Sequence, residues 1–107
     1  MDAEFFCRHS DICKTLANDK RQMILASLRD GERTVSDIVD VTGMSQANVS
    51  QHLARMRAAD VVSMRREGAF VYYRLANPKL IQAFDLITEV MMEADQRRLS
   101  RPDGEEE

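Results

Sequence analysis

The sequence predicts a mainly α-helical domain with one small β-hairpin, arranged as a winged helix-turn-helix whose hairpin lies between the fourth and fifth helices. The main observation is in residues 45–75, SQANVSQHLARMRAADVVSMRREGAFVYYRL, where an amphipathic helix precedes two short apolar strands and an arginine-flanked turn. This order of elements places a helix in the DNA major groove and a hairpin on the flanking backbone. The composition agrees with one globular domain, because 44% of the 107 residues are apolar and 31% are charged.

Two helices are predicted before residue 31. The first covers about residues 3–17, where apolar side chains recur at helical spacing. The second begins at Asn18 or Asp19, both of which can cap a helix, and it stops at Gly31. The residues expected on the apolar faces are Phe5, His9, Ile12, Cys13 and Leu16 in the first helix, and Ile24, Leu25 and Leu28 in the second.

The third and fourth helices form the expected helix-turn-helix. Thr34 begins the third helix with Asp37 three positions on, close to a capping box, and Gly43 ends it. The fourth helix runs from Gln46 to about Ala59. The residues expected to face inward are Val35, Ile38 and Val39 in the third helix, and Val49, Leu53 and Met56 in the fourth.

The hairpin and a last helix complete the domain. Residues 61–64 predict the first strand, 67–69 the turn, and 70–75 a second strand rich in β-formers. Asn77 then caps the last helix, with Pro78 at its first position. Its apolar residues at near-heptad spacing are Leu80, Phe84, Ile87, Met91 and Ala94.

The net charge of −3 is distributed unevenly. Residues 46–74 hold five arginines and two carboxylates, whereas residues 101–107 hold one arginine and four carboxylates. The expected DNA face is therefore basic although the whole chain is acidic. The domain is expected to occupy residues 1–99, followed by an acidic tail over 100–107 that has nothing to bury and is expected to be disordered.

The first and last predicted helices have longer apolar faces than a small core can cover. An exposed apolar patch commonly marks an interface. A twofold dimer through these two helices would bury the patch and would place two recognition helices one turn of DNA apart. We therefore expect a homodimer on an inverted repeat in double-stranded DNA, the alternative being that both helices pack only within their own subunit.

The outward face of the fourth helix carries the residues expected to read DNA. Asn48 and Gln51 can pair with adenine, while Ser45, Ser50 and the first-turn N–H groups suit phosphate. A merely solvated face would carry lysine and glutamate, and there is neither between residues 45 and 54. The full set expected at the DNA is Ser45, Gln46, Ala47, Asn48, Ser50, Gln51, His52, Arg55, Arg65 and Arg66.

Three members of this set have alternatives. His52 lies at the edge of the buried stripe, where a histidine is more typical of a packing residue or phosphate donor than of a metal ligand. Arg65 and Arg66 either contact phosphate or the minor groove, or belong to an ordinary polar hairpin tip. Because adjacent side chains on a strand point to opposite faces, only one of these two arginines is expected to make the direct contact.

Residues 49–75 resemble the ArsR/SmtB-type bacterial winged-helix repressors, whose pattern is V-S-x-H-L-x-x-L-x-x-A-G-L-V, then R-R-x-G and Y-Y-x-L. Met56 replaces a leucine of the pattern, and Asp60-Val61 replaces glycine-leucine. The resemblance extends over about residues 12–92. It implies a homodimeric repressor that releases its operator when a metal ion, a metalloid or an oxidant acts on it. The matching residues are Val49, Ser50, His52, Leu53, Ala59, Arg65, Arg66, Gly68, Tyr72, Tyr73 and Leu75.

The well-marked sensor sites of that family are absent from the sequence. Residues 35–39 lack the C-x-C pair of one site, residues 78–98 lack the histidine of another, and the second and last helices lack the cysteines of a redox pair. What remains on the first helix is Cys7, His9 and Cys13, which suit a thiophilic metal or metalloid ion. The alternatives are thiol oxidation and a packing role for both cysteines.

Other classes of protein are less well supported by the sequence. An enzyme is not expected, because no acid–base pair, nucleophile constellation or phosphate loop is visible. The alternatives are a repressor without direct metal or thiol sensing, and a winged-helix module for protein–protein contact, which would need apolar anchors on the recognition helix. Two cysteines, a polar N-terminus and the lack of an apolar run of roughly 18–20 residues predict a cytoplasmic location and no membrane partner.

Overall fold

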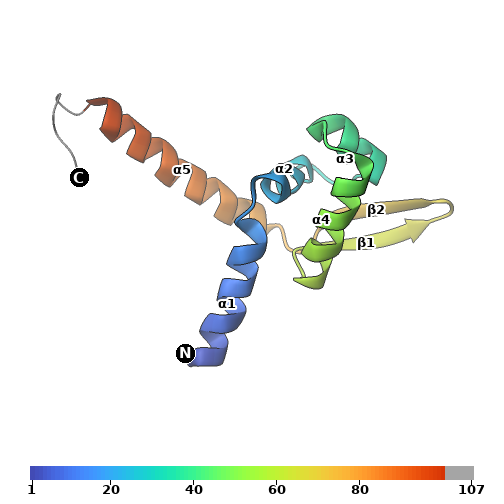
Figure 1. The fold of residues 1–107 in the computed structure, drawn as a ribbon, viewed down its shortest axis with the longest axis horizontal. Coiled ribbons are helices and arrows are strands. Elements are labelled where there is room, and N and C mark those ends of the chain that lie inside the picture. The colour runs from blue at the N-terminus through green and yellow to red at the C-terminus, as the bar shows by residue number, and fades with distance from the viewer. Residues whose placement is uncertain (101–107) are drawn as a thin grey trace.

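The computed structural model describes residues 1–100, and within them it has five helices and one antiparallel hairpin, so the predicted winged helix-turn-helix is confirmed. Helices α2, α3 and α4 and the hairpin form a body, from which α1 and α5 extend as two arms (Figure 1). Of the expected acidic tail, Ser100 ends α5, and 101–107 lie outside the described residues. The elements in order are α1 (Ala3–Leu16), α2 (Asp19–Ser27), α3 (Val35–Thr42), α4 (Gln46–Ala58), β1 (Val62–Glu67), β2 (Phe70–Leu75) and α5 (Lys79–Ser100).

The caps predicted for α2 and α3 are present, whereas α5 begins at Lys79, one residue after the first position predicted at Pro78. Asn18 caps α2, where its Oδ1 accepts the N–H of Arg21 at 3.1 Å. Thr34 and Asp37 form the full capping box of α3, each side chain accepting the backbone N–H of the other at 3.1 Å. Gly43 ends α3 with a φ of 74°, a left-handed conformation that glycine adopts at little cost. These local interactions fix where α2 and α3 begin and where α3 turns into α4.

The hydrophobic core lies between α2, α3, α4 and the start of β1. Burying one large apolar side chain stabilises a fold by about 1.5–3 kcal/mol, so these contacts hold the body together. The stripes predicted for α2 and α4 are buried as expected, whereas in α3 only Ile38 is fully buried and Val35 and Val39 lie half-buried at the edge. The buried residues are Ile24, Leu25, Leu28, Ile38, Met44, Val49, Leu53, Met56, Val61 and Val62.

The hairpin is longer than predicted and has a third partner. Strand β1 continues to Glu67, which pairs with Phe70, so the turn has two residues and begins at Gly68 with a φ of 60°. In addition, Arg33 pairs with Tyr73 through two backbone hydrogen bonds of 2.9 and 2.8 Å. The loop between α2 and α3 is thereby fixed to the outer edge of β2.

The two arms bury no residue completely within the single chain. Leu16 of α1 and the residues Leu80, Ile81 and Phe84 of α5 pack against the core. Farther out the apolar faces are exposed, so the alternative in which both helices pack only within their own subunit is wrong. The large apolar residues left exposed on the arms are Phe5, Phe6, Ile12, Leu86, Ile87, Val90, Met91, Met92 and Leu99.

Polar contacts join the arms to α2. Arg21 and Gln22 donate to backbone carbonyls at the end of α1, and Arg29 forms a bidentate ion pair with Asp85 of α5, with distances of 2.7 and 2.9 Å. This pair lowers the pKa of Asp85, chiefly through the hydrogen bonds from Arg29. Within residues 1–100, no helix is both long enough and apolar enough to cross a bilayer.

Candidate nucleic-acid interface

The position of α4 is set by its buried side and by the turn before it. Three side chains on one side of α4 are at most 1% exposed. In the α3–α4 turn, Met44 is buried and its N–H donates to the hydroxyl of Thr42, which itself donates to the carbonyl of Ile38 at 2.7 Å. The turn therefore holds the N-terminus of α4 in one orientation toward solvent. The three buried side chains are Val49, Leu53 and Met56.

The opposite side of α4 is exposed, polar and without acid. No carboxylate occurs between Ser45 and Ala59, so nothing on the helix opposes the positive end of its dipole. Ser45 caps the helix by accepting the N–H of Asn48 at 3.1 Å, and its hydroxyl hydrogen remains available for a phosphate oxygen. The predicted contact residues that are exposed on this side are Ser45, Gln46, Ala47, Asn48, Ser50, Gln51 and Arg55.

His52 lies apart from that exposed face. It is half-buried, and its Nδ1 is 3.5 Å from Nη1 of Arg21, whose guanidinium also bonds carbonyls at the end of α1. Burial lowers the pKa of His52, and the positive charges of Arg21 and Arg55 lower it further. A half-buried imidazole with a lowered pKa, already in contact with Arg21, fits the packing alternative better than a charged contact to phosphate.

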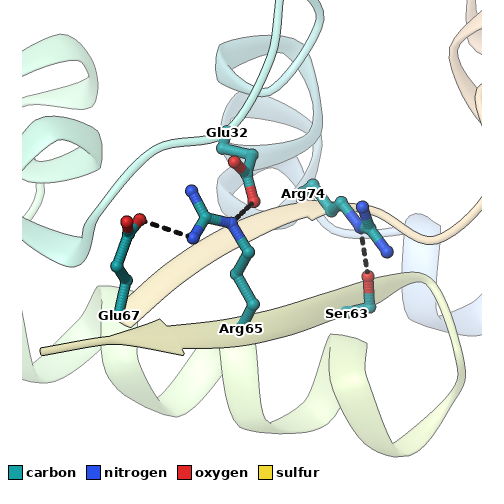
Figure 2. Close-up of polar contacts among 5 residues, drawn as sticks. All are labelled: Glu32, Ser63, Arg65, Glu67 and Arg74. Carbon is teal, nitrogen blue, oxygen red and sulfur yellow. Dashed lines mark hydrogen bonds and ion pairs between the residues drawn. The ribbon is translucent and has the colours of Figure 1, made fainter. Parts of the chain in front are cut away.

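The two arginines of the hairpin, which we call the wing, lie in different surroundings. The guanidinium of Arg65 donates to Glu32 and to Glu67 at 2.7 Å each (Figure 2). Its central carbon lies 4.6 Å from the ring centre of Tyr72. The hydrogen bond from Arg65 lowers the pKa of Glu32. Within residues 1–100, Arg66 is exposed and has no carboxylate within 4.0 Å. Among the residues that the structure describes, Arg65 thus has carboxylate partners and Arg66 has none.

The candidate sensor residues do not form a complete metal site in one chain. Sγ of Cys13 lies 3.6 Å from Nδ1 of His9, one turn away on α1, while Cys7 lies outside this pair. Both cysteines are exposed, so a packing role within the subunit is wrong. In the part of the chain that the structure describes, no group of three or more histidines, cysteines and carboxylates is arranged to hold a metal ion.

Three contributors to this region could not be found from the sequence. Glu32 and Tyr72 engage Arg65, and Arg21 reaches His52, yet neither Glu32 nor Arg21 belongs to a motif of the wing or the recognition helix. Arg21 and His52 are 31 positions apart in the sequence, and Glu32 and Arg65 are 33 positions apart. The contact between Arg65 and Tyr72 is instead made across the hairpin. Of these three contacts, only the one between Arg65 and Tyr72 could be inferred from the sequence, because the two residues are paired across the strands if the register of the hairpin is known.

The fold and this surface define a winged helix-turn-helix DNA-binding domain, because a capped, acid-free helix lies beside a hairpin that carries an exposed arginine. Residues 18–64 match the model of the bacterial regulatory protein arsR family. The chain is 39% identical over 94 residues to the arsenic resistance transcriptional regulator ArsR1 of Pseudomonas putida, which is 87% of this chain and 72% of that protein. The chain belongs to the ArsR family of bacterial regulatory proteins.

Two further comparisons agree with this assignment. The transcriptional activator HlyU of Vibrio cholerae is 32% identical over 85 residues, 79% of each chain. Among solved structures, a homodimeric winged helix-turn-helix DNA-binding domain from Mycobacterium bovis superposes with a TM-score of 0.77 at 31% identity, covering 97% of this chain and 93% of that one. The chain spans between 34% and 62% of the length of some other curated relatives. ArsR1 and HlyU are named as regulators of transcription, which agrees with the expected class.

Proposed function

We propose that this chain is a cytoplasmic, homodimeric repressor that binds an inverted-repeat operator. The observation that carries the proposal is the exposed, carboxylate-free face of α4 beside the unengaged Arg66 of the wing. A protein–protein module would need apolar anchors on that face, and its exposed residues are instead serines, amides and Arg55. Repression follows where the operator overlaps a promoter, because a bound dimer blocks polymerase.

The proposed contacts are of two kinds: reading contacts to base edges, which recognise the sequence, and anchoring contacts to the phosphate backbone. Asn48 and Gln51 are placed to pair with base edges in the major groove, since amide side chains bond adenine bidentately. Ser45, at the positive end of α4, suits a phosphate oxygen, as do Arg55 and Arg66 at the flanks. Ser50, Gln46 and Ala47 complete the contact surface.

The proposed dimer joins α1 and α5 of one subunit to those of its partner. The support comes from the apolar side chains that both arms leave exposed, and from the homodimeric state of the Mycobacterium bovis domain. Twofold symmetry then repeats the recognition helix, as an inverted-repeat operator requires.

The test compares a reading residue with an anchoring residue on a selected operator and its base-substituted variants. Gln51→Ala should lose discrimination at particular base pairs, about 1–3 kcal/mol each. Arg66→Ala should weaken binding to all sequences and reduce the salt dependence by about 0.9 per half-site. Gln82→Ala, at an exposed glutamine outside α4 and the wing, is the control once its dimerisation is shown to match the wild type, and it should then bind as the wild type does. Equal losses on every sequence for both variants would contradict the division of roles.

A thiophilic ion is the proposed effector, since Cys7 and Cys13 are the only thiols of the sequence and both are exposed. His9 and Cys13 supply two ligands on α1, and the partner subunit or Cys7 would have to supply the rest. The ArsR1 relative is named for arsenic resistance, which makes arsenite the first ion to test. A coupling of about 1–3 kcal/mol would change operator affinity about 5- to 150-fold.

The effector test measures operator release by arsenite, cadmium, zinc and an oxidant. The wild type should release its operator with at least one of these, and a Cys7→Ser, Cys13→Ser double variant should not. Release that persists in the double variant would show that the thiols are not the sensor. No release from the wild type would favour a repressor without direct metal or thiol sensing.

A further inference from the structure

Two of the three guanidinium nitrogens of Arg65 are hydrogen-bonded to carboxylates in the single chain, while the side chain stays 45% exposed. Its Nε donates to Glu32 and its Nη1 to Glu67, both at 2.7 Å, and the group stacks on Tyr72 with its carbon 4.6 Å from the ring centre. In Figure 2 the side chains of Arg65 and Glu67 rise from the hairpin toward the loop that carries Glu32. We call this set, Glu32, Arg65, Glu67 and Tyr72, the wing clamp.

The clamp attaches the wing to a backbone segment that is itself fixed. Residue 33, next to Glu32, is paired with β2 through the two backbone hydrogen bonds between Arg33 and Tyr73. The Nε of Arg33 also donates to the carbonyl of Ser27 at the end of α2, at 2.6 Å. Because α3 begins at Val35, directly after this loop, the clamp ties the wing to the start of the helix-turn-helix.

The neighbouring arginine lies on the other face of the hairpin. Side chains alternate along a strand, so Arg66 shares a face with Val62, which is buried in the core against the helices of the body. Arg65 shares the opposite face with Ser63, whose hydroxyl is 3.1 Å from Nε of Arg74 (Figure 2). Arg66 thus lies on the side of the wing where α4 packs, beyond the end of the core.

A phosphate bound to Arg65 would meet an electrostatic cost in either of two positions. At the remaining Nη2 it would lie close to the carboxylates of Glu32 and Glu67, and drawing the guanidinium out of the clamp would leave both carboxylates unpaired beside the phosphate backbone, where like charges repel. We propose that Arg65 is a positioning residue, which holds the wing against the α2–α3 loop, and that Arg66 makes the phosphate contact. This proposal rests on the DNA-binding function proposed above.

The first test measures how operator affinity depends on salt, because each phosphate contact contributes about 0.9 to the slope of log K against log salt. In a dimer, Arg66→Ala should lower the slope by about 1.8, one contact per half-site. Arg65→Ala should weaken binding and lower the slope by clearly less than about 1.8, because it leaves two carboxylates that repel DNA but removes no phosphate contact. A slope lowered by about 1.8 in Arg65→Ala would overturn the proposal.

A double-mutant cycle asks whether Arg65 acts through the clamp. In a Glu32→Gln background, Arg65→Ala should cost clearly less affinity than in the wild type, because the contact to Glu32 is already weakened. The same loss in both backgrounds would overturn the proposal.

The third test uses the DNA-free protein and so does not depend on operator binding. Hydrogen exchange of the Tyr73 amide, which donates to the carbonyl of Arg33 at 2.8 Å, reports whether the loop stays attached to the wing. Arg65→Ala should accelerate this exchange, and Arg66→Ala should not. If the exchange rate in Arg65→Ala equalled that of the wild type, the positioning role of Arg65 would be overturned, whether or not the protein binds its operator. A wild type that bound no DNA would instead refute the proposed function.

Discussion

Ile87→Ala tests the dimer most directly, because the side chain is 70% exposed in the single chain and supports nothing in its own core. Full burial of an isoleucine side chain contributes about 1.5–3 kcal/mol, so covering the exposed part contributes about 1–2 kcal/mol per subunit. The twofold axis doubles this to about 2–4 kcal/mol per dimer. The dissociation constant of the dimer should therefore rise about 30- to 700-fold.

Sedimentation equilibrium across a range of protein concentrations measures this constant. Val41→Ala is the matched control, because Val41 is 55% exposed on α3, away from both arms, and should leave the constant unchanged. Operator affinity should fall with dimerisation, since two linked half-sites become one. If Ile87→Ala dimerised like the wild type, this part of α5 would not belong to the interface, and the area argument would be refuted.

Three further predictions concern stability. Thr34→Ala removes the capping box of α3 and should lower the free energy of unfolding by about 1 kcal/mol, whereas Ser36→Ala on the same helix should not; urea titration distinguishes them. Ile38→Ala leaves a cavity at a fully buried position and should cost about 2–5 kcal/mol in the same assay, so a smaller loss would mean that the core closes around it. The pKa of His52 lies below its ordinary 6.5 because of burial and nearby arginines, so unfolding takes up a proton and stability should fall as pH drops below about 6.5. His52→Asn should remove that part of the pH dependence, and an unchanged profile would contradict the lowered pKa.

The sequence by itself determined the elements whose causes are local. Thr34 and Asp37 are three residues apart, and Gly43 acts on its own helix end, so the limits of α3 follow from neighbouring residues. The spacing of Val49, Leu53 and Met56 likewise defines one face of α4, and the opposite, exposed side follows from it. The resemblance to the ArsR/SmtB pattern also predicted the hairpin and its two arginines, Arg65 and Arg66.

Only the tertiary structure decided which of the wing arginines is engaged and how far the core reaches. Glu32 meets Arg65 across 33 residues and Arg29 meets Asp85 across 56, and no local pattern fixes which distant charges become neighbours. The exposure of Ile87 also depends on where the body ends along α5, since its helical spacing matches that of Phe84, which does pack on the core. Local propensity and periodicity place a residue on an element and on a face, but its partner is chosen by how separate elements pack together.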